Sequence, residues 1–499
     1  MPQNPTQETA GPPPESEATR AAPDRIPREV FVLGGVLTLG VVMSTLDTTI
    51  VSVGVNSMGR DLRASVDVIQ WVATSYLLAF SMVIPLTGWA VDRFGARRAW
   101  LAALTVFVAG SALCGLAWSP GSLIGFRAFQ GLGGGMLLPL SQTVLARACR
   151  PQLLGRVMGM AAIPGMLSPV FGPVIGGLIV DHLSWPWLFY VNLPLGAVAI
   201  WLAWRVLPAD GPVRSLPLDW VSVLLLSPGL AAVVLGFSQA GGHAGFGAPL
   251  AVPALLVGAV MLAAFVVHAL RRRSAPLVDL RLFRVPSFAA STAASFLLGA
   301  SLFGALILFP LYYQLVRGQS AMTAGLMLAP QGIGAVLVTP YAGKLTDRLG
   351  SGKVVPAGLL LALLGTLPYA FIGSDTPEPW LAGALLVRGL GLGLTFMPTL
   401  VAAYHGIGKE SVAQATTMVN IAQRVGGSLG TALLSMVLQR AYQQQAGDGS
   451  LLSSVAAGAS AGHLVHAFDQ VFWWTLGFSL LALVPAALLP RKPREAAGS

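Results

Sequence analysis

The 499-residue sequence contains few charged residues, cysteines or histidines, and each scarcity excludes a class of protein. Charged side chains make up 10% of the chain, against roughly 25% in a typical soluble domain, whereas apolar side chains make up 55%. Water could not solvate a globule or a disordered chain of this composition. Two cysteines, Cys114 and Cys149, provide no disulfide framework, and the six histidines show no metal-site spacing. We therefore expect the chain to lie in a lipid bilayer.

Apolar stretches long enough to cross a bilayer recur along the whole chain. A helix needs ~20 apolar residues to cross ~30 Å of hydrocarbon. Fourteen stretches meet this requirement, near residues 30–53, 67–90, 99–118, 121–146, 157–180, 187–207, 219–238, 249–270, 287–313, 322–342, 354–373, 379–403, 411–438 and 469–490. Outer-membrane barrels have short alternating segments instead. The sequence therefore predicts an all-α membrane protein with fourteen transmembrane helices.

The basic residues are divided unequally between the two sides of this predicted bundle. An even number of helices places both termini on one side. Of the 30 lysines and arginines, 23 fall in tails or loops on that side and four on the other. Because basic residues concentrate in cytoplasmic loops, both termini are predicted to be cytoplasmic. This topology also accounts for the net charge of +10 without a nucleic-acid partner.

A sequence motif, GxxxDRxG, occurs once in each half of the chain. It is formed by Gly88, Asp92, Arg93 and Gly95 after the second predicted helix, and by Gly343, Asp347, Arg348 and Gly350 after the tenth. Two helices later, Arg127 and Arg388 each precede a glycine-rich run. Such a duplicated bundle is typical of transporters. We predict a disordered tail (1–28), a six-helix bundle (29–207), a two-helix insertion with a basic loop (208–286), a second six-helix bundle (287–490) and a tail (491–499).

Together with this repeat, three further segments resemble the major facilitator superfamily, specifically its fourteen-helix drug:proton antiporter branch (EmrB/QacA type). They are Leu46–Val51, the helix 5 run that contains Gly165, Gly172, Pro173, Gly176 and Gly177, and Trp187–Gly196. The resemblance covers about residues 30–490. It implies the major facilitator fold and an antiporter motif in helix 5. It also implies that Asp92 reaches the start of helix 13 near Ser411, and Asp347 the start of helix 5 near Gly155.

Asp47 is the only acid that we expect well inside an apolar stretch. A central carboxylate costs ~2.5–3.5 kcal/mol on insertion scales, so it marks a functional site by default. Asp47 and Arg127 each lie about six residues from the outer end of their helix, which places them in one layer at ~1.5 Å per residue. Their common depth favours a pair in which Asp47 exchanges protons and Arg127 regulates it. The alternative is a static buried ion pair.

The repeated motif and helix 5 each have a mechanical interpretation. Asp92 and Asp347 stand at helix C-termini, where the macrodipole disfavours an anion, so they require partners elsewhere. They therefore suggest a latch between the halves, and the alternative is a pair of topological markers. Prolines kink helix 5 and glycines let a neighbour approach closely. By resemblance this rigid helix blocks proton leak, and the alternative is simple tight packing.

Several polar and aromatic side chains are candidates for the lining of a substrate cavity, with ordinary packing as the alternative for each. Arg388 and Arg424 have no intramembrane acid to pair with. We assign Arg388 to helix packing, whereas Arg424 either packs or faces the cavity. One acid against three bases disfavours a dication and fits neutral, zwitterionic or anionic cargo. The candidates are Tyr76, Gln130, Phe303, Tyr312, Gln331, Asn420 and Arg424.

These observations predict a multi-pass protein of the bacterial inner membrane, and a transporter rather than an enzyme. The predicted activity is proton-coupled efflux of a small amphipathic compound (a drug, antibiotic or secondary metabolite) by alternating access. The sequence has no G-x-x-x-x-G-K-[ST] phosphate loop, which speaks against ATP as the energy source. We expect no cofactor and no metal, and a monomer suffices. The alternatives are an uptake symporter, a lipid translocase of the same fold, and a non-transporting receptor or scaffold.

Overall fold

The computed structural model describes residues 26–149, 153–210, 217–242, 245–272, 277–373, 376–446 and 461–491, which form helices and turns without a strand. Within these ranges, eleven helices are long and apolar enough to span a membrane, or twelve if one bent pair counts as a single span. Two further helices of 29 residues, α6 and α7, have the necessary length. The arrangement is consistent with the fourteen predicted spans. Most of the two predicted tails lies outside the described residues.

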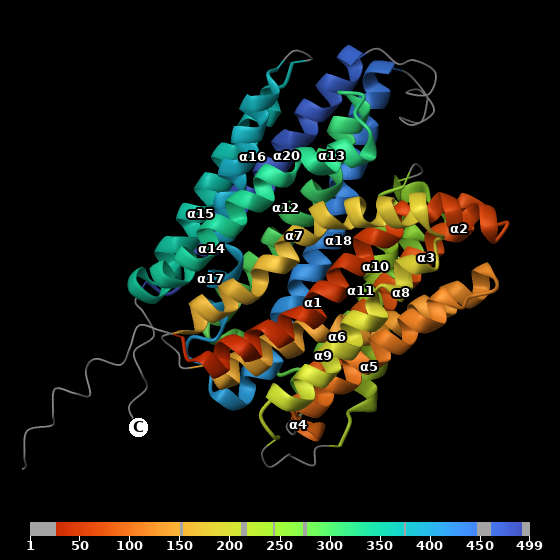
Figure 1. The fold of residues 1–499 in the computed structure, drawn as a ribbon. Coiled ribbons are helices and arrows are strands. Elements are labelled where there is room, and N and C mark those ends of the chain that lie inside the picture. The colour runs from red at the N-terminus through yellow and green to blue at the C-terminus, as the bar shows by residue number, and fades with distance from the viewer. Residues whose placement is uncertain are drawn as a thin grey trace, which may run out of the picture.

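The N-terminal half forms one bundle, which occupies the red-to-yellow part of Figure 1. Its helices are α1 (Arg28–Val53), α2 (Val55–Asp61), α3 (Val66–Val83), α4 (Leu86–Phe94), α5 (Ala96–Gly115), α6 (Pro120–Ala148), α7 (Leu154–His182), α8 (Trp187–Tyr190) and α9 (Asn192–Val206). The second predicted span is broken, because α3 and α4 meet at 55°. Pro85 stands at this break, where a proline has no N–H to continue the helical ladder.

The C-terminal half repeats the bundle in green to blue. Its helices are α12 (Pro286–Leu315), α13 (Ala321–Met327), α14 (Ala329–Leu349), α15 (Ser351–Thr366), α16 (Glu378–Gly393), α17 (Phe396–Ala403), α18 (Val412–Ala446) and α20 (Ala461–Ala487), with the 3-10 helix η5 (Leu367–Phe371) after α15. Two predicted boundaries are wrong. The helix predicted to end at 438 continues to Ala446, and the one predicted to begin at 469 begins at Ala461. Both helices continue beyond the apolar stretch on which the boundaries were predicted.

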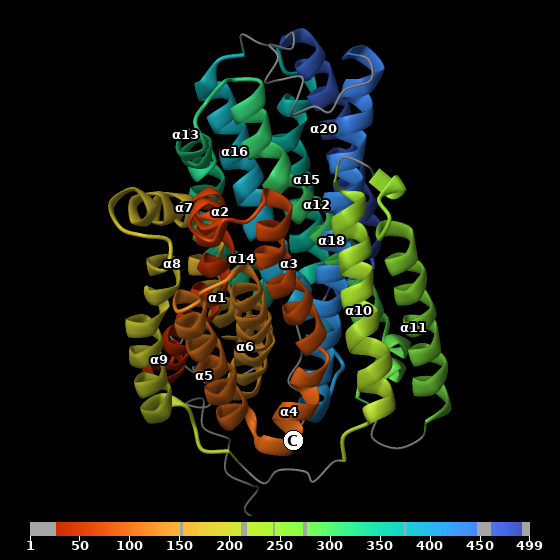
Figure 2. The same ribbon diagram turned by 90° about the vertical axis from the view of Figure 1, so that its right-hand side faces the viewer.

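The two inserted helices form a hairpin on one flank of the molecule. α10 (Trp220–Ala240) packs on α11 (Ala251–Arg271), and α10 also packs on α3 and on α18, as Figure 2 shows. The hairpin therefore contacts both halves. Asp219 caps the start of α10 by accepting a hydrogen bond from the Ser222 N–H at 3.3 Å, which satisfies a donor that the first turn cannot pair internally.

The halves contact each other mainly through α7 against α14, with α18 against α6 and α4. A direct hydrogen bond crosses this seam from Asn420 Nδ2 on α18 to Gln142 Oε1 on α6 at 2.7 Å. The seam therefore carries polar as well as apolar contacts, and a cavity lies within it.

Candidate functional site

Asp47 lies inside the N-terminal bundle and forms an ion pair with Arg127. The carboxylate Oδ2 is 2.5 Å from Arg127 Nη1, and neither side chain is more than 1% exposed. The sequence placed these residues at one depth, and the structure brings them into direct contact. Removing two charges from solvent is costly, so this pair requires further hydrogen bonds to remain ionised.

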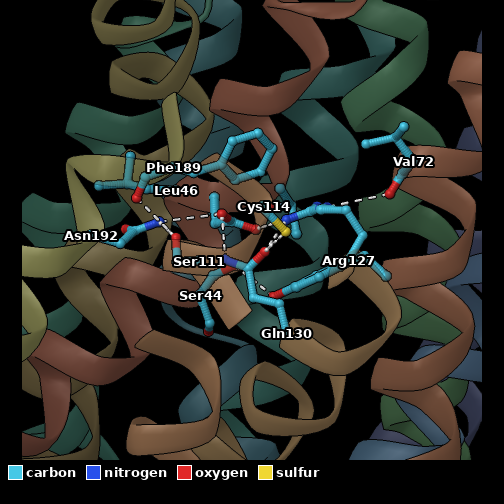
Figure 3. Close-up of polar contacts among 12 residues, drawn as sticks. Ser44, Leu46, Val72, Ser111, Cys114, Arg127, Gln130, Phe189 and Asn192 are labelled. Carbon is cyan, nitrogen blue, oxygen red and sulfur yellow. Dashed lines mark hydrogen bonds and ion pairs between the residues drawn. The ribbon is translucent and has the colours of Figure 1, made fainter. Parts of the chain in front are cut away.

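Two amide side chains supply those hydrogen bonds, as Figure 3 shows. Gln130 donates from Nε2 to Asp47 Oδ1 at 3.0 Å and accepts from Arg127 Nη1 on its own Oε1 at 2.7 Å. Asn192, at the start of α9, donates from Nδ2 to the same Oδ1 at 3.3 Å and to Ser111 Oγ at 3.1 Å. The carboxylate is therefore held by three donors from two helices.

Helix α3 supplies two further partners for the guanidinium of Arg127. Its Nε donates to the Val72 carbonyl at 3.3 Å, and its Cζ lies 4.1 Å from the ring centroid of Tyr76. Tyr76 is fully buried against this cation. An aromatic face stabilises a desolvated cation, so α3 holds Arg127 even if Asp47 becomes neutral.

Glycines on α6 bring this helix close enough to its neighbours to form the network. A Cβ on Gly131 would lie 2.5 Å from the Tyr76 carbonyl of α3, and one on Gly133 would lie 2.4 Å from the Phe107 nitrogen of α5. No larger residue fits at this separation. The glycine-rich run after Arg127 therefore sets the distance at which Arg127 and Gln130 reach α1 and α3.

A separate cavity of about 310 Å³ lies between the halves. Its lining includes Thr38, Thr45 and Thr49 of α1. At ~100° per residue these threonines lie roughly 160–180° around α1 from Asp47. The cavity therefore lies mainly on the side of α1 that is turned away from Asp47, and its lining reaches round the helix to Thr48, roughly 100° from Asp47.

The remaining wall of the cavity comes from both halves. Hydroxyl and amide side chains stand among apolar ones, and no side chain that the structure places on this wall is ionisable. Two of the predicted lining residues, Phe303 and Gln331, lie on it. Asn420 lines a small adjoining pocket of about 20 Å³. Tyr76 and Gln130 lie instead in the Asp47 network, and Tyr312 packs in an aromatic cluster with Phe468.

Arg388 occupies in the C-terminal half a place comparable to that of Arg127, but without an acid. It donates to Gln331 Oε1 and, from Nε at 3.2 Å, to Thr366 Oγ1. Its Cζ lies 4.9 Å from the ring centroid of Phe309. An aromatic face and neutral acceptors therefore stabilise this cation, and its positive charge stays uncompensated among the described residues.

Arg424 bridges the two halves through aromatic rings. Its Cζ lies 4.6 Å from the centroid of Phe80 on α3 and 5.7 Å from that of Phe303 on α12. No acid pairs with it within the described ranges. Because Phe303 lies on the cavity wall, this second cation stands directly behind that wall.

The two GxxxDRxG motifs, which we call the gate motifs, make different contacts. Asp92 pairs with Arg147 within its own half, at 3.3 Å between Oδ1 and Nη2, and Gly88 lies against Gln414 of α18. In the other half Asp347 Oδ2 lies 3.9 Å from Arg156 Nε at the start of α7. A Cβ on Gly343 would lie only 2.5 Å from the Arg156 nitrogen. The predicted cytoplasmic ends of the two halves are thus in contact.

Helix α7, which carries the predicted antiporter motif, runs along the seam between α1 and α14. A Cβ on Gly172 would lie 2.0 Å from Thr49 Oγ1, and one on Gly176 would lie 3.1 Å from the Ile50 carbonyl. A Cβ on Gly177 would meet nothing within 4 Å. Gly172 and Gly176 thus permit close approach to α1. The side chains at Gly165 and Pro173 lie outside what the structure describes.

Three residues that the sequence interpretation did not single out make polar contacts between separate parts of the chain. Asn192 joins the Asp47 network, and its place in the Trp187–Gly196 segment was the only available signal. Asp469 lies on α20, five residues inside the part of that helix that is long and apolar enough to span a membrane, whereas the span predicted from the sequence began at this residue. Its carboxylate accepts a hydrogen bond from the backbone of Ile372.

The third residue that the sequence interpretation missed is Asp219. It stands at the start of α10 and contacts two residues at the end of α11, so it joins the two inserted helices. Arg272 Nη1 lies 2.6 Å from its Oδ1, and His268 Nε2 lies 3.2 Å from its Oδ2. Burial acts to raise the pKa of Asp219, but hydrogen bonds from Ser222 and His268 and the charge of Arg272 together hold it below its usual value. This cluster stabilises the hairpin. No group of three or more His, Cys, Asp or Glu side chains suited to a metal gathers within the described ranges.

Comparison with known proteins identifies relatives of this chain. The chain is 37% identical over 498 residues to the multidrug resistance protein B homolog of Mycobacterium tuberculosis, covering 95% of this chain and 92% of that one. It is 30% identical over 404 residues to the multidrug export protein EmrB of Haemophilus influenzae, covering 80% and 79%.

Among solved structures, the human organic anion transporter MFSD10 (TETRAN) superposes with a TM-score of 0.59 at 17% identity, covering 91% of this chain and all of the other. The proton:xylose symporter XylE superposes with the same TM-score at 14% identity, covering 91% and 96%. These likenesses support the fold. The profile of the Major Facilitator Superfamily matches residues 37–431, and the chain therefore belongs to this superfamily of multi-pass membrane transporters.

Proposed function

We propose that this protein exports a small amphipathic compound from the bacterial cell in exchange for protons, with Asp47 as the proton-exchanging group. The observation that carries the proposal is a carboxylate sealed inside one half, on the helix whose opposite face lines the cavity between the halves. Relatives named as multidrug resistance and multidrug export proteins support efflux as the direction.

Protonation of Asp47 would act through the packing of the N-terminal half. A neutral carboxyl loses its ionic attraction to Arg127, whereas the guanidinium keeps Val72, Gln130 and the Tyr76 ring. The contacts of α1 with α6 and α9 would therefore weaken while those of α6 with α3 persist. Because the other face of α1 lines the cavity, a shift of α1 changes the cargo site. Proton binding and cargo binding would then be coupled through α1, and the two would not compete for the same side chain.

The test is uphill transport in inside-out vesicles with an acidic lumen. One charge moving through ~100 mV yields ~2.3 kcal/mol, which sustains a gradient of roughly fiftyfold. We expect Asp47→Asn to abolish uphill accumulation while downhill exchange partly survives, because the cavity remains. Asp469→Asn is the matched control, since it neutralises another acid on a helix long and apolar enough to span the membrane without touching Arg127. Full accumulation by the Asp47 variant would refute the assignment.

The same vesicles separate the alternative functions. Loss of substrate on acidifying the lumen would indicate an uptake symporter. Movement of a fluorescent phospholipid in liposomes would indicate a lipid translocase. Absence of any flux from reconstituted, folded protein would indicate a receptor or scaffold.

We further propose that the gate motifs form a latch between the halves. The pair Asp347–Arg156 joins the two halves, whereas Asp92–Arg147 lies within the N-terminal half, on the helix whose Gly88 contacts Gln414 of the other half. We expect Asp92→Asn to slow turnover and to leave substrate affinity little changed, because Asp92 does not line the cavity. Equal turnover by the variant and the wild type in proteoliposomes would reduce Asp92 to a topological marker.

A further inference from the structure

The chemistry of the cavity wall narrows the class of cargo. The wall presents threonine and serine hydroxyls and three glutamine amides among apolar side chains. Helix α7 also passes the cavity, and its sequence from Val157 to Val180 contains no ionisable residue. Every side chain that α7 presents to the cavity in this stretch is therefore uncharged. A cargo with a full charge would find no counter-ion on this wall.

Two amides on the wall have their acceptor atoms already engaged, so they face the cavity as donors. Arg388 has donors only, so the atom of Gln331 that meets it is Oε1, and the Nε2 hydrogens remain available. Gln142 accepts on Oε1 from Asn420 Nδ2, which also donates to the Thr416 carbonyl. Neither Nε2 atom has a hydrogen-bond partner in the described part of the chain. These two amides thus present N–H groups from opposite halves.

The wall formed by α1 has the opposite polarity. Thr48 and Thr49 donate their hydroxyl hydrogens to the carbonyls of Thr45 and Leu46 on their own helix, at 2.6 and 2.9 Å. The Thr45 hydroxyl is shared between the Val41 carbonyl and Ser168 Oγ of α7, at 2.9 Å each, so Thr48 and Thr49 form the accepting part of this wall. A hydroxyl that has used its hydrogen keeps only acceptor capacity. The α1 wall therefore accepts hydrogen bonds, whereas Gln142 and Gln331 donate them.

Two cations behind the cavity wall provide a second basis for selecting the cargo. Arg388 lies directly behind Gln331, and Arg424 lies behind Phe303. With no acid paired to either cation among the described residues, the cavity has a positive potential, which disfavours a cationic cargo. The same potential strengthens the donor character of Gln331, since its amide is polarised by Arg388.

We infer that the cavity binds an uncharged compound with hydroxyl or N–H groups along the edge that faces α1 and carbonyl-type acceptors along the opposite edge. The volume of about 310 Å³ suits a compact molecule, since it is near the lower limit of common ligand pockets. This inference rests on the proposed transport function and specifies its substrate class.

Equilibrium binding to the purified full-length protein in nanodiscs tests the inference without a proton gradient. The neutral probe is radiolabelled chloramphenicol, which carries two hydroxyls and an amide carbonyl, and the cationic probe is ethidium. Gln331→Glu keeps the partner of Arg388 but removes the N–H donors. Thr48→Val removes an acceptor from the α1 wall, and Thr48→Ser restores it. Thr105→Val is the matched control, because the Thr105 hydroxyl likewise donates to a carbonyl of its own helix, that of Leu101, on an exposed face.

We expect chloramphenicol to bind more tightly than ethidium. Gln331→Glu and Thr48→Val should each weaken its binding roughly three- to tenfold, while Thr48→Ser and Thr105→Val leave it nearly unchanged. Equal or tighter binding of ethidium, no binding of chloramphenicol, or no effect of the first two variants would overturn the inference. Uphill export of another compound would then still support the transport function. Conversely, the expected binding pattern without flux would refute export and leave the cavity chemistry standing.

Discussion

Neutralising the Asp47–Arg127 pair one residue at a time should destabilise the protein far more than neutralising both. Each side chain is at most 1% exposed, so a single substitution leaves a buried charge without its counter-ion, at a cost of about 3–5 kcal/mol. The double variant Asp47→Asn/Arg127→Gln leaves no buried charge at this site, and we expect it within ~2 kcal/mol of wild type. The two single penalties, if additive, would sum to about 6–10 kcal/mol. The cycle should therefore show a coupling of at least ~4 kcal/mol.

The two single variants should also respond differently to pH. In Arg127→Gln the isolated Asp47 can take up a proton, which removes the buried charge, so this penalty should shrink as the pH falls. In Asp47→Asn the isolated Arg127 cannot lose its proton, so this penalty should not change with pH. Asp47→Asn should also be the milder substitution at neutral pH, because Arg127 keeps Val72, Gln130 and the Tyr76 ring.

The free energy of unfolding can be measured by titrating each variant with SDS in mixed micelles and following tryptophan fluorescence. Penalties that add within ~0.5 kcal/mol in the double variant would refute the reasoning, since they would show that the two charges do not depend on each other. A penalty for Arg127→Gln that grows at low pH would refute the assignment of the buried charge to Asp47.

Three further predictions concern packing and the inserted hairpin. Gly172→Ala should cost about 1–3 kcal/mol of stability by forcing α7 away from α1, whereas Gly177→Ala should be tolerated, and unfolding in SDS checks both. Gly343→Ala should slow transport in proteoliposomes more than Gly88→Ala, because its new methyl group meets backbone at 2.5 Å and that of Gly88 meets its neighbour at 3.5 Å. Asp219→Ala should lower stability by about 1–2 kcal/mol at neutral pH. The lowered pKa of Asp219 stabilises the fold above its unfolded pKa of about 4 and loses that effect as the pH falls through the folded value, so the difference should vanish in acid. A difference that persists at low pH would contradict this.

The sequence alone determined those features that depend on composition and order along the chain. Runs of apolar residues located the membrane segments, because backbone polar groups in lipid must be satisfied within a helix. The duplicated GxxxDRxG motif indicated two related halves. Depth along a helix predicted that Asp47 and Arg127 share a layer, because helical rise is constant at ~1.5 Å per residue. Their atoms lie 2.5 Å apart in the structure.

Only the tertiary structure decided which face of each helix meets which neighbour. The membrane helices are apolar on most of their surface, so periodicity does not distinguish a side that faces lipid from one that faces another helix. Contacts such as Asn192 with Asp47, and Asp219 with Arg272, join residues 145 and 53 positions apart, and no local pattern pairs them. The separation of Asp47 from the cavity, and the division of the wall into acceptor and donor sides, likewise arise from how the helices are rotated and packed. For this protein, sequence identified the chemical groups, and packing determined which of them face the cargo and which remain sealed from it.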